Sequence, residues 1–190
     1  MIRGRLNAVR ACLSLLPEPG RRRFLRRLVL LQGEEAQRFW NELLGDDGPF
    51  TTLDGIVDDS HLFRLAAAAN GARVGPMLRR LLEQASVERR RAIAGEERRD
   101  LFYACEEMLF GDASSEYGLR CLASLAEAEN ESWSNNSSGV VREAFLPLHP
   151  QMPLTLDRRL ELLRELLGAA QSDALGKLAV DAAAAVLEPD

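Results

Sequence analysis

The chain has few of the residues that catalytic and metal sites use most often. Its 190 residues include only two histidines and three cysteines, and Lys177 is its one lysine. A shortage of histidine leaves little general-base capacity near neutral pH. The motifs G-x-S-x-G, H-E-x-x-H and G-x-G-x-x-G are also absent. We therefore expect a protein that is not an enzyme and that binds no cofactor.

The cysteines do not form a disulfide or zinc pattern. Cys12, Cys105 and Cys121 are odd in number, widely spaced and without a C-x-x-C pair, and each lies in a leucine-rich stretch. Such cysteines are typically buried free thiols, which fit a reducing cytoplasm. We expect a cytoplasmic protein.

Long apolar runs are missing as well. Arg3, Arg5 and Arg10 interrupt the apolar residues at the start of the given sequence, so we expect no signal peptide there. No stretch approaches the roughly 20 apolar residues that a helix needs to cross a bilayer. The sequence therefore predicts no membrane partner.

Charge is divided unevenly along the chain. Residues 1–100 carry 18 Arg and 14 Asp or Glu, whereas residues 101–190 carry 6 Arg or Lys and 15 Asp or Glu. This asymmetry is typical either of solvated helical faces or of surfaces sorted by charge for a partner.

Apolar residues recur at helical spacing along most of the chain, and no stretch reads as a strand. One clear stripe consists of Leu101, Phe102, Cys105, Met108 and Leu109, and the clearest amphipathic helix lies at the start of 115–145. We expect helices over 2–16, 21–31, 34–44, 61–70, 77–85, 87–93, 98–110, 115–126, 139–145, 157–167 and 173–187. The predicted fold class is all-α.

A glycine- and aspartate-rich break spans residues 45–60. Its length exceeds the ~2–8 residues usual between packed helices, and its apolar residues indicate a short turn of helix or an irregular flap. Its aspartates do not follow the EF-hand spacing, so we expect no metal. We interpret 1–190 as one helical domain, with a sub-boundary in 45–60 and a helical-repeat part over 60–190.

A second break, EAENESWSNNSS at 127–138, is polar. We interpret Glu127, Glu129 and Glu131 as a solvated acidic edge, and Trp133 as an anchor that holds the break against the core. Asparagine and serine side chains in such a segment bind free backbone groups at helix ends. The break is either a junction between helices or a recognition loop, and Trp133, Asn135 and Asn136 are its candidate surface residues.

The helix expected over 21–31 begins with arginines, where the helix dipole favours acids. Arg22, Arg23, Arg26 and Arg27 are therefore candidates for an interaction surface. Alternatively, their stems cover apolar surface while their charges stay in water. Together with 79–80, 89–91 and 98–99, these arginines suggest nucleic-acid binding as the alternative function. Steep salt dependence would follow, although an acidic chain with few aromatics among its arginines argues against it.

Helix starts near 98, 139 and 172 recur at roughly 35–40 residues, close to the period of helical solenoids. The run over 98–185 resembles HEAT or armadillo repeats. The segment LRCLASLAEAENESWSNNSSGVVREAF and the later LDRRLELLRELL also resemble the C-terminal helical regions of large prokaryotic signalling and defence NTPases. The chain has no G-x-x-x-x-G-K-[ST] loop.

The resemblance implies antiparallel helix pairs stacked as a short α-solenoid. It also implies a non-catalytic interaction, scaffold or sensor module, belonging to a larger prokaryotic protein or detached from one, whose partner is another protein or domain. Because the Ala-rich last helix is a poor solenoid cap, that partner or a second copy is expected to cover it.

Overall fold

The computed structural model describes residues 34–131, 133, 136–169 and 173–187, together with residues 11, 15–17, 20 and 27. In this part of the chain there are nine α-helices, one 3₁₀ helix and no strand, which confirms the all-α prediction. The helices expected over 2–16 and 21–31 lie outside the described residues. The elements are α3 (Glu34–Leu43), η1 (Pro49–Thr51), α4 (Leu53–Asp58), α5 (Ser60–Gln84), α6 (Val87–Arg91), α7 (Gly95–Leu109), α8 (Ser115–Glu127), α9 (Ser137–Ala144), α10 (Leu156–Ala169) and α11 (Asp173–Leu187).

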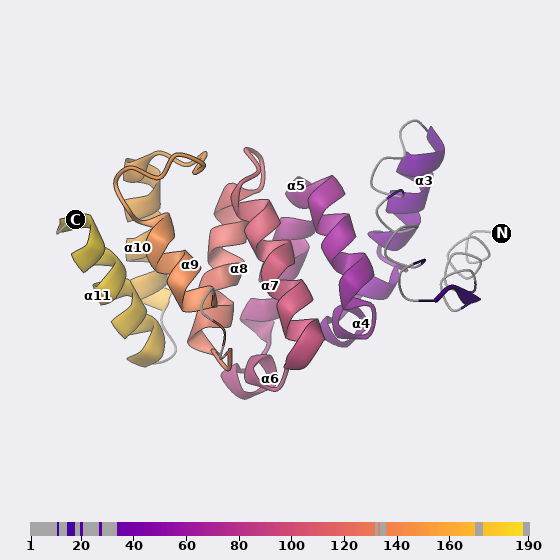
Figure 1. Cartoon of the computed structure of the whole chain (residues 1–190), viewed down its shortest axis with the longest axis horizontal. Coiled ribbons are helices and arrows are strands. Elements are labelled where there is room, and N and C mark those ends of the chain that lie inside the picture. The colour runs from indigo at the N-terminus through magenta and orange to yellow at the C-terminus, as the bar shows by residue number, and fades with distance from the viewer. Residues whose placement is uncertain are drawn as a thin grey trace.

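The helices lie side by side along the long axis of the molecule (Figure 1). Helix α5 packs against α7 and α8, and α8 packs in turn against α7 and α9. At the far end α11 packs against α8, α9 and α10. The buried apolar side chains between these helices form one continuous cluster.

Helices α7 and α8 provide the centre of this core. The α7 stripe predicted from the sequence is confirmed, since all five of its side chains are at most 1% exposed: Leu101, Phe102, Cys105, Met108 and Leu109. Cys105 and Cys121 are buried free thiols, as predicted, while Cys12 lies outside the described residues. Burial and the neighbouring Cys105 raise the pKa of the Cys121 thiol, so this thiol stays protonated.

Gly118 lets α7 and α8 approach backbone to backbone. A Cβ atom at this position would lie 2.4 Å from the Leu109 amide nitrogen and 2.8 Å from the Cys105 carbonyl oxygen. At Gly75 on α5 a Cβ atom would lie 2.5 Å from the Cβ of Tyr117 on α8. Close packing of α8 against both neighbours therefore depends on residues without a side chain.

The 45–60 segment folds against the core as η1 and α4, which confirms the predicted short turn of helix. Phe50 and Ile56 are buried, and the Phe50 ring meets Phe63 of α5 edge-on at 5.2 Å. Thr52 begins α4 by accepting a hydrogen bond from the Gly55 amide at 3.1 Å. Among the described residues, no group of three or more His, Cys, Asp or Glu side chains is arranged to hold a metal ion.

Helix α5 (Ser60–Gln84) is made of two helices joined across a kink at Asn70, whose backbone is not helical (φ −141°, ψ 41°). The first therefore ends where the sequence predicted. The second was expected over 77–85, and this start is wrong, because residues 71–75 are helical. Val74 and Gly75 are buried there. Tertiary packing therefore outweighs the low helix propensity of the glycines.

Candidate functional site

The glutamates at the polar break after α8 belong to a buried ion-pair network. Their interpretation as a solvated acidic edge is wrong. Glu127 is 4% exposed, and the Glu131 side chain is fully buried. Arg90 of α6 binds the Glu127 carboxylate at 2.6 Å, and Arg98 of α7 binds Glu131 at 2.6 Å. These carboxylates are buried because each meets an arginine from earlier in the chain.

Arg98 also closes two helix ends. Its guanidinium donates to the Leu125 carbonyl at 2.7 Å, to the Ala128 carbonyl at 3.5 Å and to the Arg90 carbonyl at 3.2 Å. The last carbonyls of a helix lack partners within the helix, so a charged donor placed there satisfies them. Arg98, which is 1% exposed, thereby joins the ends of α6 and α8.

The rest of the break is held in the same way. Asn130 donates to the carbonyls of Arg91, the last residue of α6, and of Ile93 in the connection between α6 and α7. Glu129 accepts hydrogen bonds from the side chains of Asn136 and Ser138, the first at the start of α9 and the second within it. These contacts are those of a junction between helices.

The candidate surface residues fall in different places. Arg22, Arg23, Arg26 and Asn135 lie outside the described residues, and Arg27 is exposed. Trp133 is half-buried, with the Arg99 guanidinium 5.3 Å above its ring. Asn136 is the N-cap of α9, accepting from the Gly139 amide at 2.8 Å.

Several arginines proposed for nucleic-acid binding are engaged within the fold. Arg90 and Arg98 are buried in the ion pairs described above, so their guanidinium groups cannot reach a phosphate. Arg79 binds Glu83 at 2.6 Å, and Arg89 binds Asp54. These arginines are not free to bind phosphate, because carboxylates on another turn of the same helix or on another helix neutralise them.

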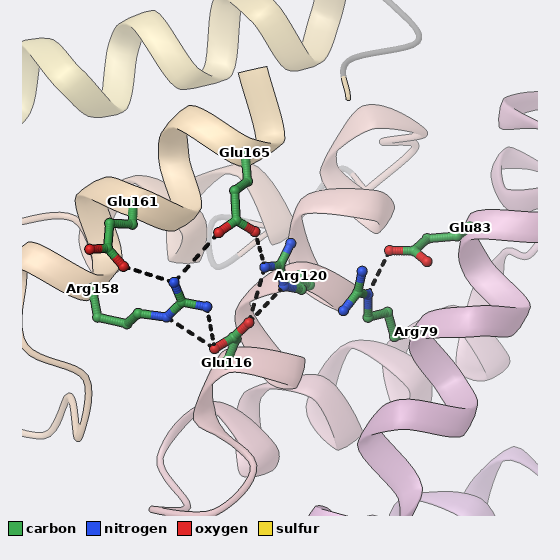
Figure 2. A network of polar contacts seen from close by, with 7 residues as sticks. All are labelled: Arg79, Glu83, Glu116, Arg120, Arg158, Glu161 and Glu165. Atoms are coloured by element: carbon green, nitrogen blue, oxygen red, sulfur yellow. Dashed lines mark hydrogen bonds and ion pairs between the residues drawn. The ribbon is translucent and has the colours of Figure 1, made fainter. Parts of the chain in front are cut away.

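A second network lies on the face formed by α5, α8 and α10 (Figure 2). We call it the charged surface. Glu116 of α8 accepts from Arg120 at 3.0 Å and from Arg158 of α10 at 2.9 Å. Both arginines also reach Glu165 of α10. The charged surface consists of Arg79, Glu83, Glu116, Arg120, Arg158, Glu161 and Glu165.

These side chains are 11% to 56% exposed, so the network faces solvent. Burial raises the pKa of Glu116, but hydrogen bonds from Arg158 and Arg120 outweigh it and leave the pKa below its ordinary value. Arg120 likewise lowers the pKa of Glu165. The sequence shows the pairs within one helix, such as Glu116 with Arg120, at i,i+4 spacing. Contacts between helices leave no local signal in the sequence. The network was therefore not predicted from the sequence.

The lowered pKa of Glu116 predicts a pH dependence. Its carboxylate adds stability that is fully present above the ordinary glutamate pKa of about 4.3 and is lost as the pH falls through the lower folded-state pKa. Glu116→Gln is therefore expected to be less stable than the wild type at neutral pH, with the difference shrinking in acid. Urea unfolding followed from neutral pH to about pH 3 measures this difference. A difference that stays constant over that range contradicts the prediction.

A third polar cluster joins α5 to α7. Asp100 accepts from the Ser60 hydroxyl at 3.2 Å and lies 3.6 Å from His61 Nδ1 and 3.8 Å from Arg64. Burial raises the pKa of Asp100, but hydrogen bonds from His61 and Ser60 outweigh it and lower the pKa. Because the Ser60 hydroxyl donates to Asp100 and not to His61, the three groups do not form a nucleophile and base pair.

The fold and these networks define an all-helical protein whose polar side chains chiefly join neighbouring helices. Comparison of the chain with protein-family models, with curated proteins and with solved structures gave no match. Within the described part of the chain, no helix is both long enough and apolar enough to cross a membrane.

Proposed function

We propose that this protein is a protein-interaction module built as a short helical solenoid, and that the charged surface is its binding face. One observation carries the proposal: arginines and glutamates from α8 and α10 meet in one partly exposed network, and the Arg79–Glu83 ion pair of α5 lies beside it on the same face. Stacked helix pairs place equivalent helices on one face, and such faces are extended recognition surfaces.

The solenoid arrangement is supported by the order of packing. Helices α5 and α7, α8 and α9, and α10 and α11 pack as pairs, and α8 contacts helices of both flanking pairs. In this arrangement α5, α8 and α10 take one face and α7, α9 and α11 the other. The starts of α7, α9 and α11 also lie close to the recurring starts expected from the sequence.

The composition of the charged surface favours a protein partner. Three arginines and four glutamates alternate across it, so a partner with charges of both signs can exchange ion pairs with it. A nucleic-acid backbone would meet the glutamates as well as the arginines, which opposes binding. Arg22, Arg23, Arg26 and Arg27 remain the candidates for that alternative.

A module of this kind acts as a scaffold or sensor by bringing another protein or domain to its own chain. The resemblance to helical regions of signalling and defence NTPases suits that role. The free thiols of Cys105 and Cys121 suit a reducing cytoplasm as its location.

A matched pair of double variants tests the proposed face. Arg158→Ala/Glu161→Ala removes one charge of each sign from the charged surface, and Lys177→Ala/Asp181→Ala does the same on the exposed side of α11. Each is expressed in the cells of origin as a tagged full chain and recovered after chemical cross-linking. We expect the α11 variant to keep the partners of the wild type. The charged-surface variant should retain them about tenfold less, a loss of about 1.4 kcal/mol.

Both variants should keep the circular dichroism spectrum of the wild type, since surface ion pairs contribute only about 0–1 kcal/mol to stability. Equal retention by the two variants would rule out the charged surface as the binding face. Recovery of no protein by the wild type would contradict the interaction function itself.

A further inference from the structure

The connection between α9 and α10 presents an apolar residue directly to solvent. Leu148 is 93% exposed, and Leu146 beside it is 36% exposed. Phe110, at the end of α7, is 38% exposed, and its ring stacks on His149 with 6.0 Å between centroids. Figure 1 shows the α7–α8 and α9–α10 connections on the same edge of the molecule. We call Phe110, Leu146 and Leu148 the apolar knob.

Arg159 of α10 holds the first half of this connection. Its guanidinium donates to the Ala144 carbonyl at 2.6 Å, to the Leu146 carbonyl at 2.8 Å and to the Pro147 carbonyl at 3.4 Å. The residue is buried, and burial lowers the pKa of its guanidinium. The backbone immediately before Leu148 is therefore fixed by a charged donor.

The second half is fixed on the other side of Leu148. The Met152 amide donates to the His149 carbonyl at 3.3 Å across a turn that contains Pro150. Met152 also lies 3.6 Å, sulfur to oxygen, from the Ser115 hydroxyl of α8. With its backbone held at both ends, the connection needs little further ordering when a partner binds, which favours affinity.

Fold stability accounts for Arg159, which satisfies the last carbonyl of α9, but it does not account for the exposure of Leu148. Arg159 has no carboxylate within ion-pair distance among the described residues, and its Nε atom lacks a hydrogen-bond partner there. An apolar residue of similar volume often stabilises a protein more than a buried charge does. Leu148 buries almost none of its own surface, so it adds almost nothing to the core. Arg159 closes the end of α9 and, through the Leu146 and Pro147 carbonyls, also fixes the backbone that presents an exposed leucine.

We propose that Leu148 is the anchor of a second protein–protein contact and inserts into an apolar pocket of the partner, whose rim is positively charged. The exposed charges nearest to the knob in the chain are Asp112, Arg142 and Glu143, which are negative in sum and complement such a rim. Rigidly held apolar side chains that fill a partner's pocket are typical binding hot spots. A bilayer suits the knob less well, because anionic lipid attracts basic segments.

Site-specific photo-cross-linking tests this proposal on the full chain in the cells of origin. A photoreactive amino acid is placed at Leu148 in one variant and at Val180, an exposed apolar residue of α11, in a second. We expect a protein adduct from position 148, mapped by mass spectrometry to an apolar site flanked by Lys or Arg, and no adduct with that site from position 180. Leu148→Asp should then weaken binding to the captured protein by about 30-fold, the effect of a 2 kcal/mol hot spot, whereas Leu148→Met should keep it.

Several results would overturn this inference. They are equal adducts from both positions, an adduct with lipid, or an adduct with a second copy of this chain. A lower thermal midpoint in Leu148→Asp would also overturn it, because the leucine would then be a packing residue. The contact is independent of the charged surface, so Arg158→Ala/Glu161→Ala should leave the adduct at position 148 unchanged.

Discussion

Arg98→Met is expected to lower the free energy of unfolding by about 3–5 kcal/mol, because it leaves the buried Glu131 carboxylate without its counter-charge. Carbonyls at the ends of α6 and α8 lose a charged donor at the same time and keep only their backbone donors. Domains are stable by only about 5–15 kcal/mol, so much of the native stability is at stake. Urea unfolding followed by circular dichroism measures the loss, which corresponds to a fall of roughly 10 °C in the thermal midpoint.

Arg80→Met is the matched control, because Arg80 is an exposed arginine on α5. Its effect should stay within about 0.5 kcal/mol, as for most surface substitutions. Adding Glu131→Leu to Arg98→Met should recover part of the loss by removing the unpaired charge, but not all, since the hydrogen bonds from Arg98 to the helix-end carbonyls stay lost. If Arg98→Met alone costs less than about 1 kcal/mol, the network does not have the structural role assigned to it.

Gly118→Ala is expected to destabilise the protein although alanine is the better helix former. Its Cβ atom would lie 2.4 Å from the backbone nitrogen of Leu109 and 2.7 Å from its Cα atom. Backbone atoms cannot rotate away as a side chain can, so α7 and α8 must separate. Overpacking of this kind costs about 1–3 kcal/mol and sometimes more, against a propensity gain of at most about 1 kcal/mol.

Gly176→Ala provides a control of opposite sign. Gly176 lies within α11, and a Cβ atom there meets nothing within 4 Å. The same substitution should therefore stabilise the protein by about 0.4–1 kcal/mol. Chemical unfolding of both variants under the same conditions measures whether each substitution raises or lowers the free energy of unfolding. A stabilising effect of Gly118→Ala would contradict the close approach of α7 and α8.

The helices were predictable because their signal is local. Residues such as Leu101 and Cys105 repeat at helical spacing, and the structure buries that face. Asn70 interrupts α5 as expected, but packing overrode propensity in residues 71–75, which are helical although the next helix was expected only from 77. There the tertiary contacts of α5 decide the backbone conformation, and the neighbouring residues in the sequence give no signal of those contacts.

The polar residues were harder to interpret for the same reason. Glu127 and Glu131 read as solvated acids, yet their partners Arg90 and Arg98 lie 37 and 33 residues earlier in the chain. The charged surface likewise joins Glu116 to Arg158 across 42 residues. Pairing at this distance depends on which helices become neighbours, and helical spacing within one segment does not determine that.

Arg98 has a consequence for how this part of the protein opens and closes. Helix α6 has only five residues, far fewer than the ~12–15 that an isolated helix needs to be even marginally stable in water. Carbonyl oxygens in the last turns of α6 and α8 accept hydrogen bonds from the same Arg98 guanidinium. Local fluctuations that release α6 must therefore also release the end of α8, so these two segments, distant in sequence, unfold and refold as one cooperative unit.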